Sequence, residues 1–175
     1  MKLKDKKTVY TGFHDLEVRT YEDVDKGITM QREVMTSKDA CASFIYHRDR
    51  KQFAFVKQFR GGSGSFVTEC VAGMMDGGET PSETIRREIK EETGCDVVKT
   101  KLVNYVHQGP ATIEGVIYLF LCIVDGYGLP RPDDGENLEI DWVDILKLPF
   151  IKFHDMKTLS LLYEFNKRKE FFNLD

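Results

Sequence analysis

The sequence predicts a single α+β domain spanning residues 1–175. Stretches typical of short β-strands outnumber stretches typical of helices, which favours a sheet covered by few helices. Hydrophobic residues make up 41% and charged residues 31% of the chain, as in an ordinary soluble globular protein. The length suits one domain, and the sequence shows neither an internal repeat nor a low-complexity segment.

The expected strands are runs rich in apolar and β-branched residues, bounded by turn residues. A mixed, polar N-terminal segment holds the first two, and a polar turn at residues 47–50 joins the next pair. A glycine-rich loop follows at residues 61–65. In chain order the strands are expected at residues 16–21, 28–35, 42–46, 53–58, 67–71, 102–106, 116–124 and 138–143.

The clearest helix signal lies between Thr80 and Gly94. Thr80 suits the N-cap position, Pro81 suits the first helical position, and Glu83 completes a capping box. Gly94 is a natural C-terminal stop. A second helix is expected over residues 155–167, where apolar residues recur at helical spacing.

Composition and charge argue against several classes of function. The formal net charge is −4 and no basic block stands out, which argues against general binding of nucleic acid or a membrane surface. The longest apolar run, residues 116–124, is too short to span a bilayer, and the N-terminus lacks the apolar core of a signal peptide. The four cysteines form no C-x-x-C pair and are expected to be reduced and mostly buried. These features predict a cytoplasmic protein.

Three glutamates near the end of the first helix suggest a metal site. At about 100° per residue, Glu88, Glu91 and Glu92 fall on one arc beside the apolar stripe of the helix. Their charges repel one another, and the helix dipole disfavours anions at this end. A hard cation such as Mg²⁺ would offset this repulsion, because it prefers oxygen ligands. The helix pattern alone leaves open a solvated acidic patch with ion pairs such as Arg87 to Glu91.

The spacing of the flanking residues favours the metal site. From Gly73 to Cys95 the chain reads GMMDGGETPSETIRREIKEETGC. This segment matches, at every fixed position, the pattern G-x5-E-x7-R-E-U-x-E-E-x-G-U, in which U is apolar. The sequence therefore resembles the Nudix hydrolase family, with residues 73–95 as its Nudix box.

This resemblance implies a fold, a cofactor and a set of roles. The family fold is an α/β/α sandwich with a mixed sheet and a loop–helix–loop catalytic motif. Mg²⁺ is the implied cofactor, and Mn²⁺ can substitute for it. The implied metal ligands are the Ala72 carbonyl and the carboxylates of Glu88, Glu91 and Glu92. Arg87 would pair with Glu79 and orient a catalytic carboxylate, so that Glu91 and Arg87 count as catalytic residues.

Further motifs resemble those of the ADP-ribose and nucleoside diphosphate sugar pyrophosphatases. These motifs are Arg-Glu-Val at residues 32–34, Gln-Phe-Arg at 58–60 and Glu-Cys-Val-Ala-Gly at 69–73. The acidic stretch 133–139 resembles the loop that supplies a base or a further ligand, for which Glu136 is the first candidate. A loop at residues 108–114 keeps an expected glutamate but reverses the usual Pro-Gly order, which puts the identity of the sugar in doubt. The substrate-binding residues implied are Arg32, Arg60, Glu69 and Glu114.

The resemblance predicts an enzyme that cleaves ADP-ribose or a related nucleoside diphosphate sugar to a nucleoside monophosphate and a sugar phosphate. Two alternatives stay open: hydrolysis of a dinucleoside polyphosphate, coenzyme A or a nucleoside triphosphate, and a non-catalytic module that binds a nucleotide sugar. The resemblance also implies a homodimer, in which the N-terminal strands of residues 1–38 pair across a two-fold axis.

Overall fold

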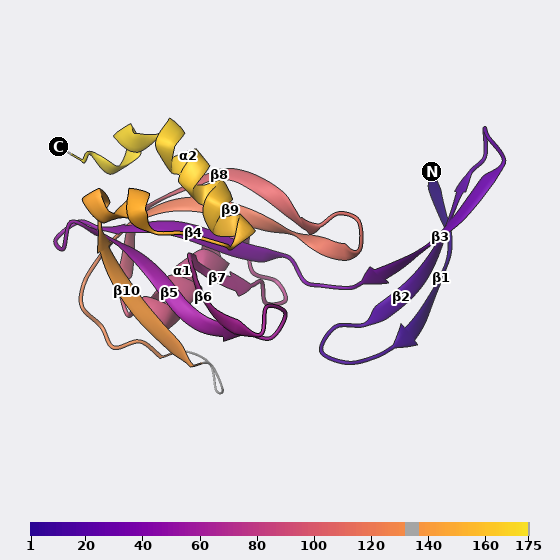
Figure 1. Ribbon diagram of the computed structural model, residues 1–175, viewed down its shortest axis with the longest axis horizontal. Coiled ribbons are helices and arrows are strands. Elements are labelled where there is room, and N and C mark those ends of the chain that lie inside the picture. The colour runs from indigo at the N-terminus through magenta and orange to yellow at the C-terminus, as the bar shows by residue number, and fades with distance from the viewer. Residues whose placement is uncertain (132–136, 175) are drawn as a thin grey trace. The chain divides into compact units, whose positions relative to one another are not determined.

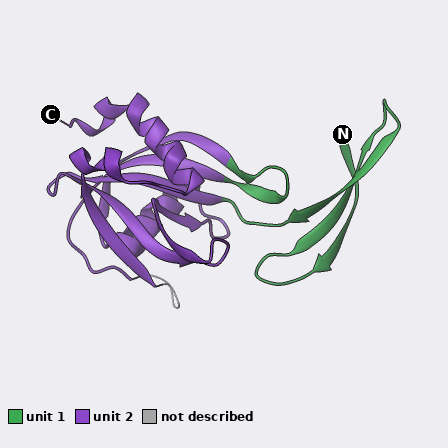
Figure 2. Cartoon of the chain, in the orientation of Figure 1, with its two compact units in different colours: residues 1–39, 107–116 green, residues 40–106, 117–175 purple. Residues whose placement is uncertain are grey.

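The structure is a computed structural model that describes residues 1–131 and 137–174. The chain forms two compact units, shown in Figure 2. The N-terminal unit comprises residues 1–39 and 107–116, and the core unit comprises residues 40–106 and 117–175.

The N-terminal unit contains a three-stranded antiparallel meander. Strand β1 (Lys2–Tyr10) pairs with β2 (Leu16–Asp23), and β2 pairs with β3 (Ile28–Met35). The end of β3 also pairs in parallel with the start of β9 (Ile113–Asp125), through Met35 and Ile113. The sequence predicted β2 and β3 but not β1, because β1 is charged and exposed along its whole length. Its strand conformation comes from pairing with β2, which no local apolar pattern announces.

The core unit is built on strand β4 (Ala40–His47), which lies at the centre of a mixed sheet. Strand β4 runs parallel to β9 (Ile113–Asp125) and antiparallel to β5 (Gln52–Arg60) and β7 (Val71–Met74). Strand β5 in turn pairs with β6 (Ser65–Glu69) and β10 (Leu138–Asp144), and β8 (Asp96–Gly109) pairs with β9. The segment expected as one strand at residues 67–71 is thus divided between β6 and β7. The strand expected at residues 102–106 is part of the much longer β8.

Alternation along β4 divides the core into two layers. Ala42 and Phe44 belong to one apolar cluster, and Cys41 and Ile45 belong to another. Neighbouring side chains of a strand point to opposite faces, so β4 must be covered on both sides. Helix α1 (Pro81–Thr93) covers one face and α2 (Met156–Lys167) covers the other, as Figure 1 shows.

The layer beneath α2 is rich in aromatic rings. Phe44 packs against Phe53, Phe55 and Phe165 with ring centroids 4.9–5.7 Å apart. Two 3-10 helices, Ile145–Phe150 and Lys169–Phe172, flank α2 and add further apolar side chains to this layer. The layered arrangement and the mixed sheet confirm the predicted fold class. None of the helices in the described residues combines the length and apolar character that a membrane span requires.

Candidate active site

Helix α1 begins after its N-cap residue Thr80 and ends before its C-cap residue Gly94. The Thr80 hydroxyl accepts a hydrogen bond from the Glu83 backbone N–H, and the Glu83 carboxylate accepts one from the Thr80 N–H at 2.8 Å. Gly94 adopts a left-handed φ of 71° and donates its N–H to the Lys90 carbonyl. The predicted capping box and C-terminal stop are thus confirmed. They place the three glutamates in the second half of the helix.

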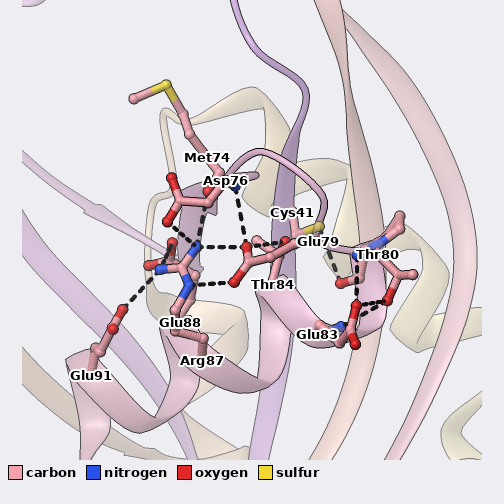
Figure 3. A network of polar contacts seen from close by, with 11 residues as sticks. Cys41, Met74, Asp76, Glu79, Thr80, Glu83, Thr84, Arg87, Glu88 and Glu91 are labelled. Carbon is pink, nitrogen blue, oxygen red and sulfur yellow. Dashed lines mark hydrogen bonds and ion pairs between the residues drawn. The ribbon is translucent and has the colours of Figure 1, made fainter.

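Arg87 joins this helix to the loop before it, as Figure 3 shows. Its Nε and Nη2 atoms donate to the two carboxylate oxygens of Glu79 at 2.8 and 3.0 Å. Its Nη1 donates to Glu88 at 2.8 Å and to Glu91 at 2.9 Å, and Nη2 also reaches the Met74 carbonyl at 3.1 Å. One guanidinium therefore fixes the loop and two of the three helix carboxylates together.

Gly73 on β7 lets the Glu88 carboxylate lie directly against the backbone. A Cβ atom at this position would overlap the carboxyl carbon and both oxygens of Glu88. The conformation of Gly73 is not left-handed, so close approach is the reason for the glycine. Ala72 precedes it on the same strand, opposite Ala42 of β4.

The three glutamates lie at the border between core and solvent. The Glu88 side chain is 12% exposed and that of Glu91 is 33% exposed, whereas Glu92 is buried at 3%. In the described residues, no three His, Cys, Asp or Glu side chains form a ready-made metal cage. Arg87 draws Glu88 and Glu91 toward itself instead. Carboxylate oxygens gathered beside an open backbone suit a hard divalent cation, so the residues present fit the implied metal.

Arg87 and Thr84 lower the pKa of Glu79. The hydrogen bonds from the Arg87 guanidinium, followed by the one from the Thr84 hydroxyl, bring this pKa from an ordinary 4.5 to about 2. The Glu79 hydrogen bond, in turn, raises the pKa of Arg87. The carboxylate of Glu79 therefore stays ionised, and paired, well into the acid range.

The lowered pKa of Glu79 predicts how its contribution to stability depends on pH. A carboxyl with a depressed folded-state pKa stabilises the fold fully above its unfolded pKa and loses this effect as pH falls through the folded value. We expect the difference in unfolding free energy between wild type and Glu79→Gln to be constant above about pH 5 and to shrink as pH falls toward 2. Urea titrations without divalent ions would measure it. A difference that stays constant over the whole acid range would contradict the pairing.

Arg60 and Glu69 meet at neighbouring strand ends, where the sequence placed two substrate-binding residues. Arg60 ends β5 and its Nε donates to Glu69 Oε1 at 2.6 Å. Glu69 ends β6 and is 2% exposed. Its other oxygen accepts a hydrogen bond from Lys157 on α2. Sequence reasoning missed Lys157. A signal existed, because Lys157 stands one turn before the buried Leu161 and two turns before the buried Phe165.

Arg32 and Glu114, the other two expected substrate-binding residues, line one groove of the N-terminal unit. The groove has a volume of about 920 Å³, and Arg19, Tyr21 and His107 also line it. Arg19 donates to both oxygens of Glu114, at 3.3 and 2.7 Å. This hydrogen bond raises the pKa of Arg19. The sequence offered no signal for Arg19, which lies far from residue 114 in the chain.

Glu136, the candidate base, lies outside the described residues, and so does the rest of 132–136. The chain just before them runs along the end of helix α1. The Arg131 N–H donates to the Glu91 carbonyl at 2.6 Å, and the Gly128 N–H donates to the Gly94 carbonyl at 3.2 Å. The backbone that leads to the acidic stretch is therefore attached to the helix that carries the three glutamates.

The four cysteines take no part in this site. All four are buried thiols outside any disulfide, as the sequence predicted. Burial raises the pKa of Cys70 and Cys122 to about 12. Their thiols stay protonated at neutral pH and behave as small apolar side chains.

Comparison with known proteins agrees with this geometry. Residues 37–162 match the model of the NUDIX domain. The GDP-mannose pyrophosphatase of Cronobacter sakazakii is 28% identical over 153 residues, covering 79% of this chain and 78% of that protein. The GDP-mannose pyrophosphatase of Salmonella typhimurium is 28% identical over 135 residues, covering 74% and 69%. A crystal structure of an ADP compounds hydrolase shares the fold, with a TM-score of 0.79, 18% identity, and coverage of 95% of this chain and 92% of that one.

The matched segment spans most of the chain and includes the whole loop–helix motif of residues 73–95. The family model, the layered fold and the arrangement of Gly73, Arg87 and the helix carboxylates agree with one another. On these grounds the chain belongs to the Nudix family of hydrolytic enzymes.

Proposed function

We propose that this enzyme is a Mg²⁺-dependent pyrophosphohydrolase that cleaves the diphosphate of ADP-ribose or a related nucleoside diphosphate sugar. Its products would be a nucleoside monophosphate and a sugar phosphate. The observation that carries the proposal is the position of Glu88, held by Arg87 on one side and seated against the bare backbone of Gly73 on the other. The names of the relatives support a nucleoside diphosphate substrate, since they are GDP-mannose pyrophosphatases and an ADP compounds hydrolase.

The residues of the box would hold the metal. Glu88, Glu91 and Glu92, with the Ala72 carbonyl, supply the oxygen ligands that Mg²⁺ prefers, and Mn²⁺ would use the same set. A bound divalent ion supplies Lewis-acid neutralisation of charge on the phosphoryl oxygens. Arg87 keeps two of these carboxylates in place through its pair with Glu79.

Other residues would bind the substrate and move a proton. The guanidinium of Arg60 suits phosphate oxygens, because its donors form a planar fork. Arg32 and Glu114 would contact the substrate from their shared groove. Glu136 would accept a proton from the attacking water, as a carboxylate base. In the reaction the oxygen of water forms a bond to one phosphorus atom, and the bond from that phosphorus to the bridging oxygen breaks. The second product keeps the bridging oxygen, and the proton released from water passes through the base to solvent or to this product.

A panel of substrates with product analysis tests this proposal. The protein is incubated with Mg²⁺ and, separately, with ADP-ribose, GDP-mannose, other nucleoside diphosphate sugars, a dinucleoside polyphosphate, coenzyme A and a nucleoside triphosphate. We expect a nucleoside monophosphate and a sugar phosphate from at least one sugar nucleotide. If only the dinucleoside polyphosphate, coenzyme A or the nucleoside triphosphate gave products, the proposed substrate class would be wrong. Saturable binding of a sugar nucleotide without any turnover would identify a binding module.

We further propose that residues 1–175 act as one domain, and that the enzyme is a homodimer formed through residues 1–38. Strand β1 supports this proposal, because it is exposed along its whole length and is an edge strand, which a second copy could extend by pairing. Light scattering tests it. A mass near 20.2 kDa, that of one chain, would exclude the dimer.

A further inference from the structure

A buried carboxylate in the core unit is shared between two cations from different elements. Glu69 is 2% exposed, and each of its oxygens accepts one charged hydrogen bond. Arg60 Nε binds Oε1 at 2.6 Å, and Lys157 Nζ binds Oε2. A buried carboxylate requires such partners, because an ion without them loses its hydration and gains nothing in return. Each oxygen of Glu69 thus already contacts a cation of the chain itself.

Arg60 uses only its Nε atom for this contact. Among the described residues, its terminal nitrogens Nη1 and Nη2 form no hydrogen bond, and its side chain is 41% exposed. A hydrogen bond through Nε fixes the plane of the guanidinium. The N–H groups of Nη1 and Nη2 are left for a ligand, and together they can bind two oxygens of a phosphate.

Lys157 is held more tightly than a surface lysine. Its side chain is only 11% exposed, and Nζ also lies 3.0 Å from Asp155 Oδ1. Asp155 is the N-cap of helix α2 and accepts from the Thr158 N–H at 2.9 Å and from its hydroxyl at 2.6 Å. The Thr158 hydroxyl accepts from the Cys70 N–H at 2.9 Å. The start of α2 is thus attached to the strand end that carries Glu69.

The charges of this cluster indicate what Lys157 does. Arg60 and Lys157 face Glu69 and Asp155, so the four charges sum to zero. Both carboxylates already surround the Lys157 ammonium, which leaves little positive potential for a substrate phosphate. Its contribution is geometric, because it keeps Glu69 in the one position from which that carboxylate orients Arg60.

We propose that Lys157 is a positioning residue, which acts through Glu69 to aim the Arg60 fork at the diphosphate of the substrate. This inference rests on the proposed function, in which Arg60 binds a phosphate. The chain of contacts runs from helix α2 through the buried carboxylate to the end of β5. It predicts that the effect of Lys157 on substrate binding disappears when Arg60 is absent.

A double-mutant cycle on the full chain tests this inference, with KM and kcat measured for the best substrate of the panel. We expect Lys157→Met to raise KM about tenfold, the scale of coupling between residues of one network, with kcat changed less than about twofold. Arg60→Ala should raise KM at least as much. In the Arg60→Ala background, Lys157→Met should leave KM unchanged. Lys152→Met, on an exposed lysine just before α2, is the matched control and should resemble wild type.

The outcomes separate the inference from the function on which it rests. A wild-type KM for Arg60→Ala would show that Arg60 does not bind a phosphate of the substrate. A raised KM for Arg60→Ala with a normal KM for Lys157→Met, or an equal effect of Lys157→Met in both backgrounds, would overturn the positioning role alone. If Lys157→Met fails to fold, Lys157→Gln replaces it in the cycle. Because the amide keeps a donor for Glu69 without the charge, KM should rise less than in Lys157→Met, and this rise should again disappear in the Arg60→Ala background.

Discussion

Replacing Glu91 or Glu92 by glutamine should lower the turnover number about a hundredfold or more, the scale of losing a catalytic charge. Each substitution keeps the shape of the side chain and removes a negative charge. Glu91 is partly exposed and accepts a hydrogen bond from Arg87, whereas Glu92 is buried. A divalent ion would lose an anionic ligand in either variant, so the concentration of Mg²⁺ at half-maximal rate should also rise. Steady-state kinetics over a range of Mg²⁺ concentrations measures both effects.

Glu83→Gln is a matched control for these variants. It removes one charge from the same helix, and glutamine can still complete the capping box with Thr80. We expect a turnover number close to that of wild type. Circular dichroism should show that all three variants keep the fold. Near-normal rates in both Glu91→Gln and Glu92→Gln would mean that the end of α1 is not the metal site.

Gly73→Ala should lower the turnover number roughly tenfold to a hundredfold without changing any charge, the range expected when a metal ligand loses its support. The new methyl group would occupy the space of the Glu88 carboxylate, which must then swing away from the β7 backbone. This variant thus tests the position of Glu88 separately from its ionisation. We expect the half-saturating Mg²⁺ concentration to rise and KM for the substrate at saturating Mg²⁺ to change less.

Gly77→Ala, in the loop that follows β7, provides the comparison. A Cβ at Gly77 meets nothing within 4 Å, and its backbone is not left-handed. This variant should therefore keep the wild-type dependence on Mg²⁺. If Gly73→Ala showed the same dependence as Gly77→Ala, the contact between Glu88 and Gly73 would have no part in ion binding.

Local features of the sequence were sufficient to predict helix α1. Thr80, Glu83 and Gly94 act on backbone groups within one turn of themselves, so their roles depend little on the rest of the fold. Neighbouring apolar side chains of β4 likewise belong to opposite core layers, because successive side chains of a strand point to opposite faces of the sheet. Because these rules act over a few neighbouring residues, the amino-acid sequence alone predicts the fold class and the extent of α1.

Contacts between segments that lie far apart in the sequence could not be predicted from such local features. Lys157 meets Glu69 across 88 residues, and Arg19 meets Glu114 across 95. The helical spacing of Lys157 marks it as lying beside the apolar face of α2, but no local pattern shows which distant residue such a charge contacts. Strand β1 was missed for a related reason, since its charged residues become a strand only through β2. The sequence thus revealed the box and its carboxylates but not the residues that contact the proposed substrate-binding residues Glu69 and Glu114.

The bonding of Arg87 has a consequence for the protein before any ion arrives. Glu88 and Glu91 already share a counter-ion that belongs to the chain itself. Their mutual repulsion is therefore offset within the chain itself, without a bound cation. A divalent ion bound by these carboxylates would have to share them with the guanidinium. Its affinity would then be lower than for the same carboxylates without Arg87, and Arg87 would set how tightly the proposed ion is held.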